Sequence, residues 1–125
     1  MFHKITTILL WSEDYERLAK WYQDVFNVRI VEHLDHPDDT GILMEFPDGQ
    51  PWVWAGKHSA ITGANKDPLR IMFNISVDSV SEAFTYLKGK GVIFIAEPFK
   101  APTFDKWFAT FSDPDGNTVQ IIGGK

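Results

Sequence analysis

Apolar residues recur along this chain with two different periods, and the change of period separates predicted helices from predicted strands. Tyr15, Leu18, Tyr22 and Val25 are spaced three or four residues apart, which places them on one face of a helix that runs to about residue 26. The short polar side chains of residues 12–14 suit the free N–H groups of a helix start. This spacing predicts a helix whose apolar face is buried.

A second helix is predicted to begin at the capping box Ser79-Val80-Ser81-Glu82, in which the serine and the glutamate can each bond a free N–H group. Gly89 and Gly91 are predicted to end it, and Asn27 is predicted to end the first helix in a left-handed conformation. The apolar stripe of the second helix consists of Val80, Ala83, Phe84 and Leu87.

Short runs of β-branched and aromatic residues predict strands before, between and after the helices. The run at residues 69–77 alternates clearly, with apolar residues at 71, 73, 75 and 77 and with Arg70, Met72, Asn74 and Ser76 on the other face. A polar loop is expected at residues 33–40. The predicted strands are residues 5–10, 28–34, 41–46, 51–55, 69–77, 92–97, 107–111 and 118–122.

One stretch, Asp113-Pro114-Asp115-Gly116-Asn117, has the residues of a tight turn between two of these strands. Pro47-Asp48-Gly49 repeats its centre in the first half of the chain. Asp14 and Asp78 are separated by the same number of residues as Tyr22 and Tyr86. The chain is therefore predicted to contain two copies of one unit, each a strand, a helix and three strands. We expect a single domain over residues 1–125, with module one at about 1–58, a linker at about 59–68 and module two at about 69–125.

Composition narrows the class of protein. The chain has 125 residues, is 44% hydrophobic and carries a net charge of −5, which excludes the basic face that nucleic-acid binding needs. It has no cysteine, so disulfides, a thiolate nucleophile and zinc–thiolate sites are excluded. The apolar run at residues 5–11 is too short to span a membrane and lacks a cleavage site, so we expect a cytoplasmic protein without a membrane partner.

The paired strand–helix–strand–strand–strand units, the Trp21-Tyr22 pair of the first helix and the Asp113–Asn117 turn resemble the vicinal oxygen chelate superfamily. This superfamily includes glyoxalase I, extradiol dioxygenases, fosfomycin-resistance proteins and bleomycin-resistance proteins. The resemblance implies an α+β fold in which paired βαβββ modules form a curved eight-stranded mixed sheet around a concave, ligand-binding cavity. It also implies a homodimer.

Enzymes of that superfamily hold a divalent metal with His, Glu or Gln side chains at four positions, two in each module. By resemblance these positions are Thr7, Val53 (or Trp54 if the register shifts by one), Met72 and Gln120. Of the residue types that serve there, only Gln120 is present, and it could ligate only through a neutral carbonyl oxygen, whereas divalent ions need several imidazole or carboxylate groups that converge. We therefore predict that the usual metal site is lost and that the chain uses no cofactor.

The concave face is then expected to bind a small organic ligand with an apolar wall and a few convergent polar groups. Trp52, Trp54 and Trp107 are considered as stacking surfaces for a planar ligand, although filling the core or a dimer interface remains an alternative. Because Trp52 and Trp54 alternate with Val53, they are expected to pack under the first helix if Val53 faces the cavity. The predicted ligand-binding residues are Thr7, Leu9, Val53, Trp54, Arg70, Met72, Asn74, Trp107 and Gln120.

A second group of candidate ligands, Glu32, His33, Asp35, His36, Asp38 and Asp39, is crowded into one stretch. We interpret this stretch as a solvated loop rather than as a surface metal site, and we expect His3 and His58 to be exposed.

The sequence favours a metal-independent small-molecule binding protein, whose acidic charge suits a cationic guest. The alternative is a metal-dependent lyase or dioxygenase of the same superfamily that uses Gln120 and a histidine at a displaced site. A third possibility is a metal-free enzyme that uses Arg70 for proton transfer. Whether a reaction is catalysed stays open.

Overall fold

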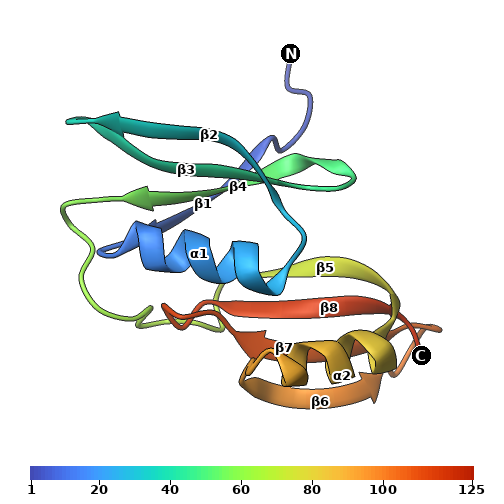
Figure 1. Cartoon of the computed structure of the whole chain (residues 1–125). Helices are drawn as coiled ribbons and strands as arrows, with labels where there is room; N and C mark the ends of the chain where they lie inside the picture. The colour runs from blue at the N-terminus through green and yellow to red at the C-terminus, as the bar shows by residue number, and fades with distance from the viewer. The chain divides into compact units, whose positions relative to one another are not determined.

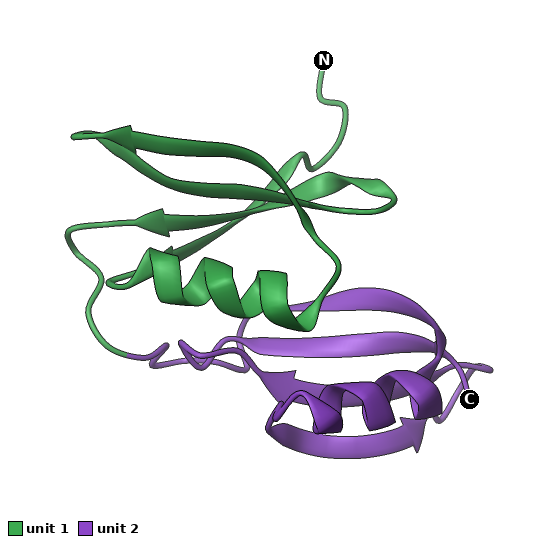
Figure 2. Cartoon of the chain, in the orientation of Figure 1, with its two compact units in different colours: residues 1–63 green, residues 64–125 purple.

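The computed structural model describes all of residues 1–125, which divide into two compact units, residues 1–63 and residues 64–125 (Figure 2). Each unit contains one helix and one four-stranded mixed sheet, and each has the element order strand, helix and three strands. The predicted α+β class and the predicted duplication are confirmed. The prediction that the strands form one curved eight-stranded sheet around a cavity is not confirmed, because the structure shows two sheets of four strands.

In the first unit the sheet order is β1-β4-β3-β2, with β1 and β4 parallel and the other pairs antiparallel (Figure 1). The helix α1 packs against β3 and β4. The elements are β1 (Thr7–Ser12), α1 (Tyr15–Val25), β2 (Arg29–His36), β3 (Asp39–Phe46) and β4 (Gly49–Lys57).

The second unit has the same topology, with sheet order β5-β8-β7-β6 and a parallel pair formed by β5 and β8. The helix α2 lies against this sheet, as Figure 1 shows. Neither α1 nor α2 is long and apolar enough to cross a membrane. The elements are β5 (Met72–Ser79), α2 (Val80–Gly89), β6 (Phe94–Lys100), β7 (Trp107–Ser112) and β8 (Thr118–Gly124).

Both helices begin where the sequence predicts. The Asp14 carboxylate accepts a hydrogen bond from the backbone N–H of Arg17, and the Ser79 hydroxyl accepts one from the N–H of Glu82. The end of α1 differs from the prediction, since Phe26 leaves the helix in an extended conformation and Asn27 does not adopt a left-handed one. The end of α2 does use a glycine, because Gly91 has a φ of 83°.

The buried core of the first unit lies between α1 and one face of its sheet. Leu18, Ala19, Tyr22 and Val25 of α1 are buried, so Ala19 joins the predicted stripe and Tyr15 is only half-buried. The alternate sheet residues Ile42, Met44, Val53 and Ala55 are also buried, and they form two cross-strand pairs, Ile42 with Ala55 and Met44 with Val53. At the end of α1 the ring of Phe26 lies 5.5 Å from that of Phe46.

The second unit repeats this arrangement. Phe73 and Ile75 of β5 pair with the fully buried Val119 and Ile121 of β8. Phe111 shares this face, and its contact with Phe94, which in turn contacts Phe84 of α2, shows that the face is the one covered by the helix. The predicted alternation of β5 is confirmed, with an apolar face toward the helix and Met72, Asn74 and Ser76 on the other side.

Several strand boundaries differ from the prediction for local reasons. Residues 67–70 form a turn, in which Arg70 N–H bonds the carbonyl of Asp67, so β5 begins later than expected. β6 continues through Pro98 because it is an edge strand, where a proline costs no ladder bond. The predicted loop at residues 33–40 is mostly strand, since β2 and β3 pair as far as His36 and Asp39.

Candidate functional site

The face of the first sheet opposite α1 carries three of the predicted ligand-binding residues, Thr7, Leu9 and Trp54. Thr7 pairs with Trp52 across the parallel β1–β4 ladder, and Leu9 pairs with Trp54. Leu43 pairs with Trp54 from the other side. Because paired residues point to the same face, this side of the sheet carries Thr7, Leu9, Leu43, Trp52 and Trp54 together. We call it the open face of the first unit.

Val53 lies on the other side of the same sheet. It is 3% exposed and pairs with the fully buried Met44 in the layer that α1 covers. The prediction that Trp52 and Trp54 pack under the first helix is therefore wrong, because the alternation that they follow places Val53 there instead. The choice of Val53 assumes that the spacing after the turn at Gly49 equals that after the turn at Gly116. The β3–β4 register shifts between Met44 and Phe46, so the spacing differs between the two units.

Trp54 is a buried residue of the open face of the first unit. It is 7% exposed, and its ring covers two glycines, Gly41 and Gly56, which face each other across β3 and β4. Trp52 is held differently, since its indole N–H donates to Glu45 Oε2 over 2.6 Å. Glu45 also accepts from Arg29 over 2.7 Å. The indole of Trp54 is thus held by packing, and that of Trp52 by a hydrogen bond.

The second unit has a polar row on its corresponding open face. Asn74, Gln120 and Thr110 pair in sequence across β5, β8 and β7. Gln120 Nε2 donates to Thr110 Oγ1 over 3.0 Å. Met72 shares this face, since it lies two residues before Asn74 on β5. The structure therefore places Met72, Asn74 and Gln120 on one face of the second sheet.

Two other predicted site residues of this unit lie elsewhere. Arg70 precedes β5, and its guanidinium pairs with the Asp67 carboxylate on the surface. Trp107 is in phase with Ala109 and Phe111, which are buried on the helix side, and Lys125 Nζ lies 5.3 Å from the centre of its ring. Neither residue shares the face of Gln120 within the second unit.

The two open faces correspond residue by residue. Leu9 and Trp54 in the first unit occupy the ladder positions of Asn74 and Gln120 in the second. Thr7 likewise corresponds to Met72, since each lies two residues earlier on its strand. Of the two alternatives left open for β4, the register therefore selects Trp54, because Val53 faces the helix. The four positions are Thr7, Trp54, Met72 and Gln120.

These four side chains do not fit a divalent metal. Tryptophan has no donor atom for a cation, methionine offers only a soft thioether, and threonine and glutamine offer neutral oxygens. Gln120 is in addition tied to Thr110 through its amide nitrogen. No group of three or more His, Asp or Glu side chains in residues 1–125 is arranged to hold a metal ion.

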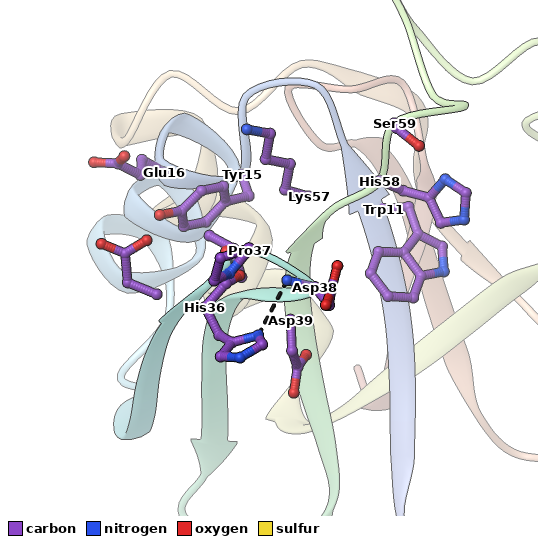
Figure 3. Close-up of a pocket in the computed structure, with 12 residues that line it drawn as sticks. Trp11, Tyr15, Glu16, His36, Pro37, Asp38, Asp39, Lys57, His58 and Ser59 are labelled. Atoms are coloured by element: carbon purple, nitrogen blue, oxygen red, sulfur yellow. Dashed lines mark hydrogen bonds between the residues drawn. The ribbon is translucent and has the colours of Figure 1, made fainter.

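A pocket of about 770 Å³ lies at one end of the first unit, where β2 and β3 meet (Figure 3). Its walls include the rings of Trp11 and Tyr15 and the carboxylates of Glu16, Asp35 and Asp39. Lys57 also reaches its rim, as Figure 3 shows. The acidic stretch is mostly strand and not the predicted solvated loop, but most of the residues that line the pocket are exposed. The pocket also contains Pro37, Asp38, Thr40, Ser59 and the two histidines His36 and His58.

The charged side chains that line this pocket affect the pKa of Tyr15. Partial burial raises the pKa of Tyr15 above its ordinary value, and the negative charges of Glu16 and Asp35 raise it further. The Tyr15 hydroxyl lies 3.4 Å from His33 Nε2. Negative charge therefore dominates this end of the unit.

The two histidines of the pocket are held by their own backbones. His36 Nδ1 accepts the N–H of Asp38 over 3.1 Å, and His58 Nδ1 accepts the N–H of Ala60 over 3.0 Å. His58 also meets Trp11 edge to face, with ring centres 5.3 Å apart. Both rings complete local turns, and His58 is exposed, as predicted.

The comparison that decides the family is a match over most of the sequence. A family model described as "Glyoxalase/Bleomycin resistance protein/Dioxygenase superfamily" matches residues 4–121. The chain belongs to this superfamily. The predicted resemblance is thus confirmed, and the superfamily accounts for the two βαβββ units. A search of curated proteins finds no match to the chain.

Solved structures of this superfamily have the same fold. The chain is similar to a glyoxylase/bleomycin resistance protein/dioxygenase domain from Frankia sp. EAN1pec, with a TM-score of 0.79, 16% identity and 100% of both chains covered. It is also similar to glyoxalase I from Leishmania major, with a TM-score of 0.78, 17% identity and coverage of 98% of this chain and 87% of that one. The fosfomycin resistance protein FosX from Listeria monocytogenes gives a TM-score of 0.75 at 14% identity, covering 100% and 96%. At these identities the likeness shows the fold alone.

Proposed function

We propose that this superfamily member is a metal-independent binding protein for a small organic molecule. The observation that supports the proposal most directly is the chemistry of Thr7, Trp54, Met72 and Gln120. They occupy corresponding positions of the two open faces and together supply no carboxylate or imidazole. A scaffold with these side chains has an apolar surface with a few amide groups, which suits an organic guest better than a cation.

The open faces supply the groups that such a guest needs. In the first unit Leu9 is 53% exposed beside Trp54, so apolar surface is available. In the second unit Asn74 and Gln120 provide neutral hydrogen-bonding groups. The net charge of −5 favours a neutral or cationic guest over an anion. A cytoplasmic homodimer is part of the same proposal.

The alternative, a metal-dependent lyase or dioxygenase with a displaced site, makes the opposite prediction for metal binding. Calorimetric titration of the protein with Ni²⁺, Zn²⁺, Mn²⁺ and Fe²⁺ separates the two. We expect no saturable binding of one ion per chain and no rise in the melting temperature. Stoichiometric binding with thermal stabilisation would support the alternative and contradict the proposal.

A variant of the same chain serves as the positive control for metal binding. The double substitution Met72→His and Gln120→Glu restores donor types at the two positions of the second unit. We expect this variant to gain a divalent-ion site that the natural sequence lacks. A gain in the variant alone attributes the difference to the donor set rather than to the assay.

A further inference from the structure

The pocket at the end of the first unit has the size of a small-molecule site. Its volume of about 770 Å³ falls within the range of about 300–1,000 Å³ that such sites have. It lies where the end of β1, the start of α1, the β2–β3 hairpin and the end of β4 meet (Figure 3). None of the open-face residues Thr7, Leu9 and Trp54 lines it. An inference about this pocket therefore goes beyond the proposed function of the open faces.

Negative charge predominates in the lining of this pocket. Four carboxylates, those of Glu16, Asp35, Asp38 and Asp39, line it together with a single lysine, Lys57. None of the four carboxylates forms an ion pair with a lysine or an arginine anywhere in residues 1–125. Their charge is therefore not neutralised by the protein, and a pocket of this kind attracts cations and repels anions.

The other polar groups of the pocket do not reverse this preference. The Nδ1 atoms of His36 and His58 each accept a backbone N–H group, so they carry no proton and the rings add no positive charge. The start of α1 is already capped, because the Asp14 carboxylate accepts the N–H of Arg17. The pocket therefore lacks the free N–H groups with which a helix start binds an anion.

Two aromatic rings complete the walls. Trp11, at the end of β1, and Tyr15, at the start of α1, lie on two sides of the pocket in Figure 3. Trp11 is 38% exposed, and Tyr15 is half-buried. The faces of tryptophan and tyrosine rings attract cations, and sites that combine such rings bind quaternary ammonium groups.

The carboxylates of the pocket are not arranged for a metal ion. A bare divalent ion needs several donor atoms that converge on one point, and no group of three or more His, Asp or Glu side chains in residues 1–125 is placed to do this. Negative groups distributed around aromatic rings suit a larger cation, whose charge is spread over several methyl or methylene groups.

We propose that this pocket binds an organic ammonium cation. Its ammonium group lies between the rings of Trp11 and Tyr15, and the carboxylates of the β2–β3 hairpin, Asp35 and Asp39 among them, supply the opposite charge. The site is separate from the open faces and does not depend on what they bind.

Choline and 3,3-dimethylbutan-1-ol test the proposal, because they have the same shape and differ in the charged nitrogen, which is a neutral carbon in the alcohol. Binding is followed by NMR, through the indole N–H signal of Trp11 and the ring signals of Tyr15. We expect choline to bind roughly fivefold or more tightly than the alcohol, the difference that one exposed cation–π contact gives. Equal affinities would overturn the proposal, and so would the absence of saturable shifts at both residues with choline.

Two double variants assign the preference to the pocket. Asp35→Asn with Asp39→Asn removes two carboxylates from its lining, and we expect choline to bind roughly threefold or more weakly while the alcohol is unaffected. Asp48→Asn with Asp105→Asn removes the same charge from exposed side chains outside the pocket and should leave choline binding unchanged. Equal losses in both variants would indicate a general effect of net charge and contradict the proposal, as would full retention in the first.

Discussion

Trp54 and Gln120 occupy the same position in the two sheets of this protein. Trp54 pairs with Leu9 across the parallel ladder of the first unit, and Gln120 pairs with Asn74 in the second. The residue at this position is thus aromatic and buried in the first unit, whereas it is polar and half-buried in the second. The duplicated units share one backbone topology but present different chemistry on their open faces.

The first prediction concerns the different roles of these two residues. Trp54→Ala removes a large buried ring, and we expect it to lower the free energy of unfolding by about 3 kcal/mol or more. Gln120→Ala breaks one side-chain hydrogen bond and should cost about 1 kcal/mol. Urea denaturation followed by circular dichroism measures both. A larger loss from the glutamine than from the tryptophan would contradict the assigned roles.

The close packing of Trp54 on the sheet gives a second prediction. A Cβ atom at Gly56 would lie 2.0 Å from Trp54 Nε1, so Gly56→Ala must displace the ring. We expect a loss of roughly 1–3 kcal/mol in the free energy of unfolding. Gly89→Ala at the end of α2 is the control, because a Cβ there meets no atom within 4 Å. Equal effects of the two substitutions would show that the ring does not rest on Gly56.

The third prediction is a pH dependence at Glu45. Its hydrogen bond to Arg29, and then that to Trp52, lower the pKa of the Glu45 carboxyl below its ordinary value. A lowered pKa in the folded state stabilises the protein above the ordinary carboxyl pKa, and this contribution disappears as the pH falls through the folded value. Stability measured against pH in the acid range should therefore fall less steeply in Glu45→Gln than in the unmodified protein. An unchanged slope in Glu45→Gln would contradict this contribution.

The hairpin turn before β8 provides the fourth prediction. Asp113 is 5% exposed, and its carboxylate accepts from the N–H groups of Asp115 and Asn117 and from the Asn117 side chain. Asp113→Ala leaves these donors without their acceptor, so we expect a loss of about 2–3 kcal/mol in the free energy of unfolding. Asp48→Ala in the corresponding exposed turn of the first unit should cost less than about 0.5 kcal/mol. Thermal unfolding of both variants provides the comparison.

The sequence predicts those elements of the fold whose causes are local. The caps at Asp14 and Ser79 and the turn around Gly116 depend on neighbouring residues only, and all three are found as predicted. The duplication was also visible, because it repeats these local signals in one order. The left-handed end expected at Asn27 failed, since extended Phe26 packs on Phe46 instead.

Which face of the sheet each strand residue occupies could be assigned only from the structure. The position of Trp54 depends on the register between β3 and β4, which shifts beside Phe46 and is set by pairing rather than by local sequence. Thr110 is not predicted as a site residue, because nothing in a β-rich run marks one threonine as the hydrogen-bond partner of a glutamine ten residues later. Strand pairing across the hairpin was the available signal, and it identifies Thr110 once the register is known. Ligand contact by the predicted residues remains a prediction.

We propose that Thr7 and Trp54 in the first unit, and Met72 and Gln120 in the second, offer surface for an organic guest in place of metal-ligating groups. Elemental analysis of untagged protein, purified without chelators, tests it most directly. We predict that nickel, zinc, manganese and iron together amount to well below one ion per chain. One equivalent of a single divalent metal, lost in the Gln120→Ala variant, would contradict the account.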